Sequence, residues 1–205
     1  MSTAVVVDYG MGNLDSVVRA IEEVGHTALR TDDPRDLCEG THIILPGVGA
    51  FGDAMANLRE GGWEEALNEQ VLEVGIPTLG VCLGMQLLAT TGFEGGEHKG
   101  LGWIDAEIVP IEPEERSLRV PHVGWNNVWP TRESPLFEGI DPGRDFYFVH
   151  SFHMVCSDAA DVLATTPYGT DLTSVVHHGN VYGAQFHPEK SQKVGFKLLS
   201  NFLAL

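Results

Sequence analysis

The sequence predicts an α/β fold, a single domain with a mostly parallel open sheet, flanking helices and a strand-rich second half. Three observations lead to this prediction. Strand-length apolar runs alternate with amphipathic helical stretches up to residue 89, as in successive β-α-β units. Between residues 102 and 177 the runs are strand-like and separated by turns. The chain has 205 residues, which suits one domain that we expect to span residues 1–205.

Apolar spacing places the elements of the first half. Residues 3–7 form a short apolar run that predicts a strand. Residues 16–24 carry apolar side chains at helical spacing, and Gly25 follows as a glycine that ends the helix. An Asp-Asp-Pro sequence at residues 32–34 opens a turn or a helix. The remaining apolar runs predict strands at 27–30, 43–45 and 78–81, and helices at 51–59, 63–74 and 85–89.

The second half begins with a strand-like run at residues 103–109, and we expect the sheet to be mixed there. A further strand is predicted at residues 179–184. Residues 191–203 predict a closing helix, because Val194, Leu198 and Phe202 are spaced four apart. Ligands of open α/β sheets bind at the carboxyl ends of the strands, so segments remote in sequence can converge on one cleft there.

Composition and charge disfavour several classes of partner. The chain carries 12 Lys and Arg against 29 Asp and Glu, a net charge of −17, which disfavours nucleic acid and anionic membranes. No apolar run is long enough to cross a membrane and no basic leader precedes the first strand, so we expect a cytoplasmic protein. The three cysteines suggest neither a disulfide framework nor a zinc site, and we expect Cys38 and Cys156 to be packing residues.

One cysteine stands at the sharpest expected turn of the chain. Gly-Val-Cys-Leu-Gly at residues 80–84 follows an apolar run and precedes a helical stretch. Glycines two positions before and after a nucleophile form the elbow of hydrolases, because larger side chains there would collide with the flanking segments. The N-terminus of the following helix favours the thiolate of Cys82. The alternative is an ordinary buried cysteine at an α/β junction.

A candidate base and an orienting carboxylate follow the run at residues 179–184. A nucleophilic cysteine needs a base, and the base benefits from a carboxylate that fixes its tautomer. In an extended segment the side chains of His187 and Glu189 would share a face, and Pro188 keeps His187 out of the α region. We therefore expect one imidazole nitrogen to bond Glu189 while the other faces Cys82. The alternative is a solvated pair in a surface loop, which the Cys82 elbow disfavours.

A glycine-flanked turn is the candidate for oxyanion stabilisation. Acyl chemistry at Cys82 would generate an oxyanion, which needs preorganised N–H donors. One donor is expected from Leu83, the residue after the nucleophile. Gly47, Val48 and Gly49 follow an apolar strand, and their turn can present a second N–H to the same point.

Together these segments resemble the class I glutamine amidotransferases, whose glutaminases use a Cys nucleophile and a His-x-Glu pair. Further segments resemble one group within that family, the glutaminase subunits of imidazole glycerol phosphate synthase from histidine biosynthesis. The resemblance runs from Val5 to Leu203 and implies a flavodoxin-like α/β fold. Its motifs lie at residues 8–14 (Asp-Tyr-Gly-Met-Gly-Asn-Leu), 46–49, 80–86, 121–126 (Pro-His-Val-Gly-Trp-Asn), 147–152 and 187–191.

The resemblance implies hydrolysis of L-glutamine to glutamate and ammonia, with no cofactor and no metal. Cys82 attacks the side-chain amide, His187 transfers the proton, and Glu189 orients His187. The turn at residues 47–49 and Leu83 would hold the oxyanion. By the same resemblance, the residues that line the glutamine pocket are Gln86, His150, Ser151 and Phe152.

The resemblance also implies a protein partner. Ammonia would pass to a cyclase subunit, a (β/α)8 barrel, in a heterodimer that makes imidazole glycerol phosphate and an aminoimidazole carboxamide ribotide. Asn13, Trp125, Tyr147 and Lys190 match family positions near that interface, although core packing explains Trp125 and Tyr147 equally well.

The sequence leaves two other interpretations. One is a glutaminase subunit for another acceptor such as chorismate, which the motifs at residues 8–14 and 121–126 disfavour. The other is a non-catalytic, flavodoxin-like regulatory module. The complete Cys-His-Glu set disfavours the module, because a protein that only binds needs no triad.

Overall fold

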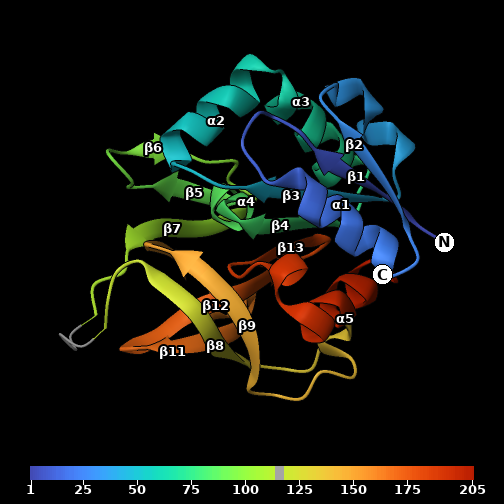
Figure 1. The fold of residues 1–205 in the computed structure, drawn as a ribbon. Helices are drawn as coiled ribbons and strands as arrows, with labels where there is room; N and C mark the ends of the chain where they lie inside the picture. The colour runs from blue at the N-terminus through green and yellow to red at the C-terminus, as the bar shows by residue number, and fades with distance from the viewer. Residues whose placement is uncertain (114–117) are drawn as a thin grey trace.

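The computed structural model describes residues 1–113 and 118–205 and has the expected α/β architecture (Figure 1). In the described residues, thirteen strands form one sheet in the order β2-β1-β3-β4-β13-β12-β10-β7-β5-β6, with β11, β8 and β9 branching from β12. The strands are β1 (Thr3–Val7), β2 (Thr27–Thr31), β3 (His42–Gly47), β4 (Thr78–Cys82), β5 (Ala89–Gly92), β6 (His98–Lys99), β7 (Ile104–Pro110), β8 (His122–Pro130), β9 (Arg144–His150), β10 (Phe152–Cys156), β11 (Val162–Tyr168), β12 (Thr170–His178) and β13 (Val181–Ala184). The α-helices are α1 (Leu14–Glu23), α2 (Phe51–Glu60), α3 (Trp63–Asn68), α4 (Leu83–Leu87) and α5 (Gln192–Phe202).

The strand pairing is parallel in one part of the sheet and mostly antiparallel in the other. β1 pairs in parallel with β2 and β3, β3 with β4, and β4 with β13. Beyond β13 the pairs are antiparallel, apart from β5 with β7. The predicted parallel first half and mixed, strand-rich second half are therefore confirmed.

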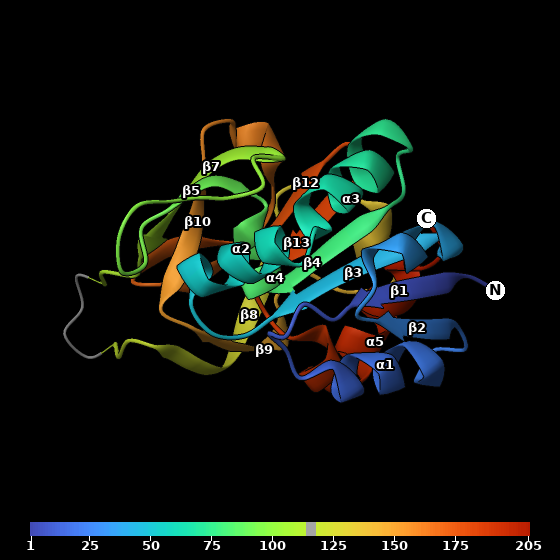
Figure 2. The same cartoon turned by 90° about the horizontal axis from the view of Figure 1, so that it is seen from above.

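Helices cover both faces of the parallel part of the sheet. In Figure 1, α2 and α3 lie on one side of it and α1 and α5 on the other. Val5 and Val7 pack with the first pair, whereas Ala4 and Val6, which alternate with them along β1, pack with the second. Burial on both faces is the reason why this strand is apolar at four successive positions, from Ala4 to Val7. Figure 2 shows both chain termini at the end of the sheet away from β5, β7 and β10.

Two of the expected helices end early because a different element follows them. The helix expected at 85–89 is α4, which ends at Leu87, and Ala89 already pairs with Ile104 as the first residue of β5. The helix expected at 63–74 is α3 followed by a π-helical turn, η2 (Glu69–Glu73). Strand pairing decides the first case, because the apolar residues after Cys82 fit a helix and a strand equally well.

The prediction that Cys38 is a packing residue is wrong, since Cys38 is exposed. It lies on a 3-10 helix, η1 (Pro34–Glu39), whose neighbouring Leu37 is the residue that enters the core. Cys156 at the end of β10 is partly buried. In the described part of the chain, no helix combines the length and the apolar character that crossing a membrane requires.

Register brings the predicted site segments to one edge of the sheet. Gly47 at the end of β3 lies opposite Cys82 at the end of β4. Val81 lies opposite Ala184 at the end of β13, three residues before His187. Because these neighbouring strands are parallel, their carboxyl ends meet at one edge, where ligands of α/β sheets bind.

Candidate active site

Cys82 occupies a strained turn between β4 and α4. Its φ of 56° lies in the left-handed region, which residues with a Cβ seldom adopt. A Cβ on Gly84 would overlap the carbonyl oxygen of Leu45, and a Cβ on Gly80 would lie 2.6 Å from the carbonyl oxygen of Gly84. The two glycines of the Gly-x-Cys-x-Gly motif are therefore required because β3, β4 and α4 pack closely around the cysteine.

The sulfur of Cys82 is buried between polar groups of two other segments. Sγ lies 3.8 Å from the carbonyl oxygen of Val149 in β9. It lies 3.9 Å from Nε2 of Gln185, the residue that follows β13. The sulfur thus has both an acceptor for a thiol proton and an N–H donor close by.

His187 and Glu189 form a buried hydrogen-bonded pair. Nδ1 of His187 donates to Oε1 of Glu189 over 2.7 Å, and the two side chains are 3% and 4% exposed. A carboxylate only accepts, so this bond places a hydrogen on Nδ1. Nε2 of His187 is buried and has no hydrogen-bond partner within residues 1–113 and 118–205. Nε2 is therefore the nitrogen that is left for proton transfer.

The backbone of this pair differs from the predicted extended segment. His187 is extended, with φ −98° and ψ 97°, but Pro188–Lys190 forms a 3-10 helix, η5. Proline at the first helical position presets φ for a helical turn. Glu189 therefore reaches the imidazole from a turn, and the expectation that the two side chains share the face of an extended strand is wrong.

The surroundings of His187 favour its charged form. Burial lowers the pKa of an imidazole, but the hydrogen bond to Glu189, the proximity of Cys82 and the negative charges that both groups can carry outweigh burial. The net effect raises the pKa of His187 to about 9. The imidazolium consequently predominates at neutral pH, beside a sulfur that can carry the opposite charge.

A closed set of hydrogen bonds ties His187 to strand β9. The backbone N–H of His187 donates to the carbonyl oxygen of Tyr147 over 2.9 Å. Oγ of Ser191 donates to the carbonyl oxygen of His187 over 2.6 Å and accepts from the N–H of Tyr147 over 3.0 Å. Ser191 is fully buried, so these bonds are shielded from water. The position of the imidazole is thereby fixed by β9.

Cys82 and His187 open into a cavity of about 380 Å³. Most of the residues predicted for the substrate and the oxyanion line it, namely Val48, Gly49, Leu83, Gln86, His150, Ser151 and Phe152. Gly47 does not. It lines a small recess on the other side of His187, together with Glu189 and two of the predicted interface residues, Asn13 and Lys190.

Three residues that line this cavity were not predicted, namely Glu94, Pro121 and Val149. Oε2 of Glu94 accepts from the N–H of Phe51 over 2.8 Å, so this carboxylate caps the first turn of α2 while it borders the cavity. Val149 contributes its backbone oxygen, which no side-chain pattern reveals. Pro121 and Val149 lie inside the family motifs at residues 121–126 and 147–152, whereas nothing in the sequence pointed to Glu94.

The amide of Gln86 is oriented by two bonds. Its Nε2 donates to the carbonyl oxygen of Phe152 over 3.1 Å and to Oε1 of Gln185 over 3.0 Å. An amide nitrogen has two hydrogens, so both are used. Gln86 thus retains only Oε1, an acceptor, for a ligand in the cavity.

A chain of neutral rings supports the cavity wall at His150. Nδ1 of His150 donates to the carbonyl oxygen of Phe152 over 2.8 Å, and its Nε2 lies 2.9 Å from Nδ1 of His122. Nδ2 of Asn126 donates to Nε2 of His122 over 3.2 Å. Burial lowers the pKa of His122 to about 4 and that of His150 to about 3. Both rings are therefore uncharged at neutral pH.

We expect these two histidines to make the folded state less stable in mild acid. An unfolded histidine has a pKa near 6.5, whereas His122 and His150 are protonated in the native chain only below about pH 4. Between these pH values the unfolded chain therefore binds two more protons at these positions than the native chain does. The free energy of unfolding should thus rise with pH across this window, by roughly 2 kcal/mol per histidine between pH 5 and 7. His187 acts in the opposite direction above about pH 6, because the unfolded chain releases its proton near pH 6.5 whereas the raised pKa keeps the native imidazole protonated; this offsets only part of the rise from the two buried histidines.

Urea unfolding of the wild type at pH 5, 6 and 7 measures this dependence. His122→Gln retains an amide donor toward His150 and removes one titrating ring, so its slope against pH should be clearly smaller. Equal unfolding free energies of the wild type at pH 5 and pH 7 would contradict the expectation.

The predicted interface residues Trp125 and Tyr147 lie side by side on the β8–β9 hairpin. They are direct partners in the register, and their rings meet edge to face with centroids 5.9 Å apart. Trp125 is 48% exposed, so core packing does not explain it. Val123 and Val149, the next pair on the same face of the hairpin, are also exposed.

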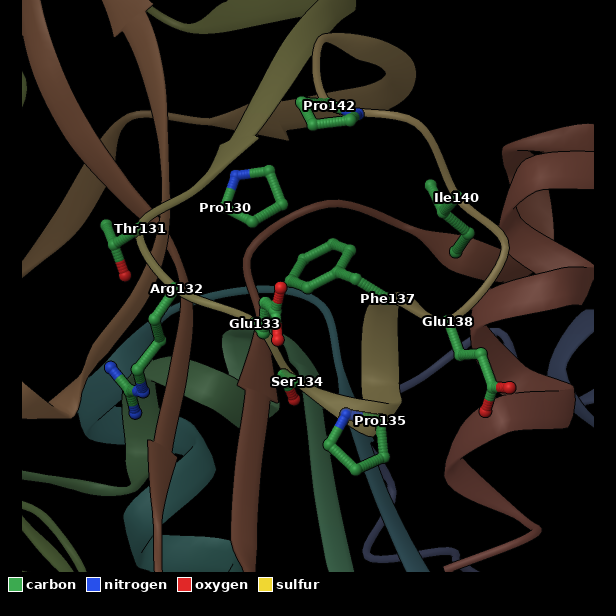
Figure 3. Close-up of a pocket in the computed structure, with 10 residues that line it drawn as sticks. All are labelled: Pro130, Thr131, Arg132, Glu133, Ser134, Pro135, Phe137, Glu138, Ile140 and Pro142. Carbon is green, nitrogen blue, oxygen red and sulfur yellow. The ribbon is translucent and has the colours of Figure 1, made fainter.

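A second cavity, of about 680 Å³, lies at the segment between β8 and β9 (Figure 3). It shares no lining residue with the Cys82 cavity, and none of the predicted site residues lines it. In the described residues, no group of His, Cys, Asp and Glu side chains is arranged to hold a metal ion.

Comparisons with known proteins point to one family. A family model described as "Glutamine amidotransferase class-I" matches residues 5–205. The imidazole glycerol phosphate synthase subunit HisH 2 of Nitrobacter winogradskyi is 46% identical over 208 residues, covering 99% of this chain and 98% of the relative. The HisH subunit of Sulfurimonas denitrificans is 49% identical over 199 residues, covering 96% and 95%.

The fold is also found among solved structures. The structure of PurLQS from Thermotoga maritima superposes with a TM-score of 0.75 at 21% sequence identity, covering 100% of this chain and 99% of that one. At this level of identity the likeness extends to the fold alone.

Proposed function

The chain belongs to the class I glutamine amidotransferases and, within them, to the HisH subunits of imidazole glycerol phosphate synthase; from this premise we propose that it hydrolyses L-glutamine to glutamate and ammonia for that synthase. We further propose that residues 1–205 act as one glutamine amidotransferase domain in the cytoplasm. The observation that carries the proposal is the convergence of Cys82 and His187 on one cavity, with Glu189 bonded to the far nitrogen of the His187 ring.

The chemistry follows from the charges around Cys82. At neutral pH the thiol proton of Cys82 resides on Nε2 of His187, and Glu189 stabilises this imidazolium through its bond to Nδ1. The thiolate of Cys82 attacks the side-chain amide carbon of glutamine and gives a tetrahedral oxyanion. His187 returns its proton to the departing ammonia, which leaves a thioester. Water activated by His187 then hydrolyses the thioester and releases glutamate.

Backbone donors hold the oxyanion in this mechanism. The N–H of Leu83 is one of the first N–H groups of α4, which have no partner within a helix. A second donor comes from the turn of Gly47, Val48 and Gly49, of which the last two line the cavity.

Substrate recognition is assigned to the walls of the same cavity. Gln86 offers only an acceptor oxygen, which suits the ammonium group of an amino acid better than its carboxylate. His150, Ser151 and Phe152 contribute a segment that the His150 ring fixes by its bond to the carbonyl oxygen of Phe152.

We propose a cyclase subunit as the partner in a heterodimer, in line with the subunit names of the relatives. The exposed face of the β8–β9 hairpin, with Trp125 and Tyr147, suits such contact, because aromatic side chains with apolar neighbours are typical of interfaces. Asn13 and Lys190 line the recess behind His187 and Glu189, so they would place the partner close to the point where ammonia is released. The partner would use ammonia to form imidazole glycerol phosphate and an aminoimidazole carboxamide ribotide.

Glutamate release from L-glutamine by the purified chain, alone and with the cyclase subunit, tests the proposal. We expect hydrolysis that increases when the cyclase and its ribulosyl aminoimidazole nucleotide are present. Stimulation by a chorismate-using partner instead would identify a glutaminase for another acceptor. Absence of hydrolysis in every combination would favour a non-catalytic, flavodoxin-like regulatory module.

A further inference from the structure

Gln185 is a buried amide whose side chain reaches the nucleophile. It follows β13 and is fully buried, and its backbone N–H donates to the carbonyl oxygen of Ser174 over 2.9 Å. Its side chain contacts polar atoms of only two residues in the described part of the chain, Gln86 and Cys82. Burying an amide against a cysteine sulfur costs more desolvation free energy than burying an apolar side chain of similar size. The amide at position 185 is therefore expected to have a function that offsets this cost.

Gln86 decides which end of the Gln185 amide faces the sulfur. Nε2 of Gln86 donates to Oε1 of Gln185 over 3.0 Å, and Gln86 is itself held by the carbonyl oxygen of Phe152. If Gln185 were turned by 180°, two NH₂ groups would face each other and one hydrogen bond would be lost. The hydrogen-bond network therefore points Nε2 of Gln185 at Sγ of Cys82, 3.9 Å away.

The contacts of the sulfur depend on its charge. A neutral thiol donates its proton to the carbonyl oxygen of Val149, 3.8 Å away, and gains little from the distant amide of Gln185. A thiolate has no proton for Val149 and is repelled by that oxygen. It then accepts from Gln185 instead, because hydrogen bonds to a charged acceptor are shorter and stronger than neutral ones. Gln185 thus acts selectively on the reactive form.

We infer that Gln185 is a further catalytic residue of the proposed glutaminase, an amide donor that Gln86 aims at Cys82 to stabilise the thiolate before attack and after the thioester is cleaved. The inference rests on the proposed function for its place in the reaction. Its physical content, stabilisation of the thiolate, is measurable without glutamine or a partner.

The rate of Cys82 alkylation by iodoacetamide across pH 5–10 tests this inference on the full-length chain. The thiolate is the species that reacts, so the profile reports how readily it forms. Mass spectrometry of the Cys82 peptide separates its signal from that of the exposed Cys38. For Gln185→Met we expect an alkylation rate at pH 7 that is roughly 5- to 10-fold lower and a profile displaced to higher pH.

Two further variants separate the donor from structural damage. Gln185→Met leaves one hydrogen of Gln86 unpaired, so the double variant Gln86→Met with Gln185→Met removes both partners and guards against failure to fold. Asn201→Leu is the matched control, because Asn201 is a buried amide that donates to the carbonyl oxygens of Leu136 and Glu138, in another part of the molecule. It should lower the unfolding temperature and leave the Cys82 profile unchanged.

The outcomes distinguish this inference from the proposed function. A displaced profile in both Gln185 variants, with the Asn201→Leu profile unchanged, supports the donor role. Wild-type profiles in folded Gln185 variants would overturn it, even if the chain hydrolyses glutamine normally. A displaced profile in a chain that hydrolyses no glutamine would uphold the thiolate contact and refute only the proposed function.

Discussion

Replacing Cys82 with Ala is expected to abolish glutamine-dependent turnover while the cyclase partner keeps its activity with added ammonium salt. Cys82 is the only side chain in the cavity that can form a thioester, and loss of a triad nucleophile lowers kcat by on the order of 10⁴- to 10⁶-fold. The second reaction consumes ammonia from any source, so it does not need the thiol. Both rates are measured on the reconstituted complex, with glutamine and with ammonium chloride as the nitrogen donors.

The control for this prediction is Cys38→Ala. Cys38 is exposed and lies outside the cavity, so its loss should leave both rates unchanged. Cys82→Ala keeps a Cβ at the same strained φ, and it should therefore fold as the wild type does. Glutaminase activity of the Ala variant at the wild-type level would refute the nucleophile, whereas loss of the ammonia-dependent rate as well would indicate a broken complex.

Local spacing predicted the parts of the site that depend on backbone geometry. The glycines around Cys82 are required by a close approach of main-chain atoms, so the pattern in the sequence records a steric constraint. The same holds for the central parallel strands β3 and β4, which are buried on both faces and are mostly apolar.

Other parts of the site arise from contacts between segments that are far apart in the sequence. The role of Gln185 depends on its contacts with Gln86 and Cys82, which lie about 100 positions earlier in the sequence. The role of Glu94 likewise depends on its contact with the first turn of α2. No local pattern marks such residues. The turn that carries Glu189 was missed because Pro188 fits an extended strand and a 3-10 helix equally well, and the packing of the following residues decides between them.

The bonds around His187 give a physical route from the partner-facing hairpin to the base. Tyr147 belongs to that hairpin, and its carbonyl oxygen accepts from the N–H of His187. Its own N–H donates to Oγ of Ser191, which in turn donates to the carbonyl oxygen of His187. A partner that shifts β9 would therefore shift the imidazole as well. In the turn of Gly47, Val48 and Gly49, only Gly47 is held by strand pairing, and no backbone bond ties Val48 or Gly49 to another segment within the described residues, which makes this turn the more adaptable part of the site.

Activity of the isolated chain is expected to be low and to rise roughly 100- to 1,000-fold when the cyclase carries its acceptor nucleotide. The turn at Gly49 has a φ of +109°, a region that glycine enters freely, so its peptide can rest with the N–H away from the oxyanion site. Partner contacts can shift that population, and one oxyanion donor is worth about 2.7–4 kcal/mol of barrier. The glutaminase rate with and without both additions measures the effect.

Gly49→Pro should remove most of this stimulation, because proline has no N–H and fixes φ near −65°, far from the value at this position. The stimulated kcat should fall much more than the KM for glutamine rises, since the donor acts on the transition state and not on the bound substrate. Val48→Ala is the matched control: it changes a neighbouring, half-exposed side chain and keeps the backbone donor, so it should retain the stimulation. A lone wild-type chain that is already fully active, and that neither the cyclase nor its ligand accelerates, would mean that the oxyanion site is permanently assembled and that the turn is no gate.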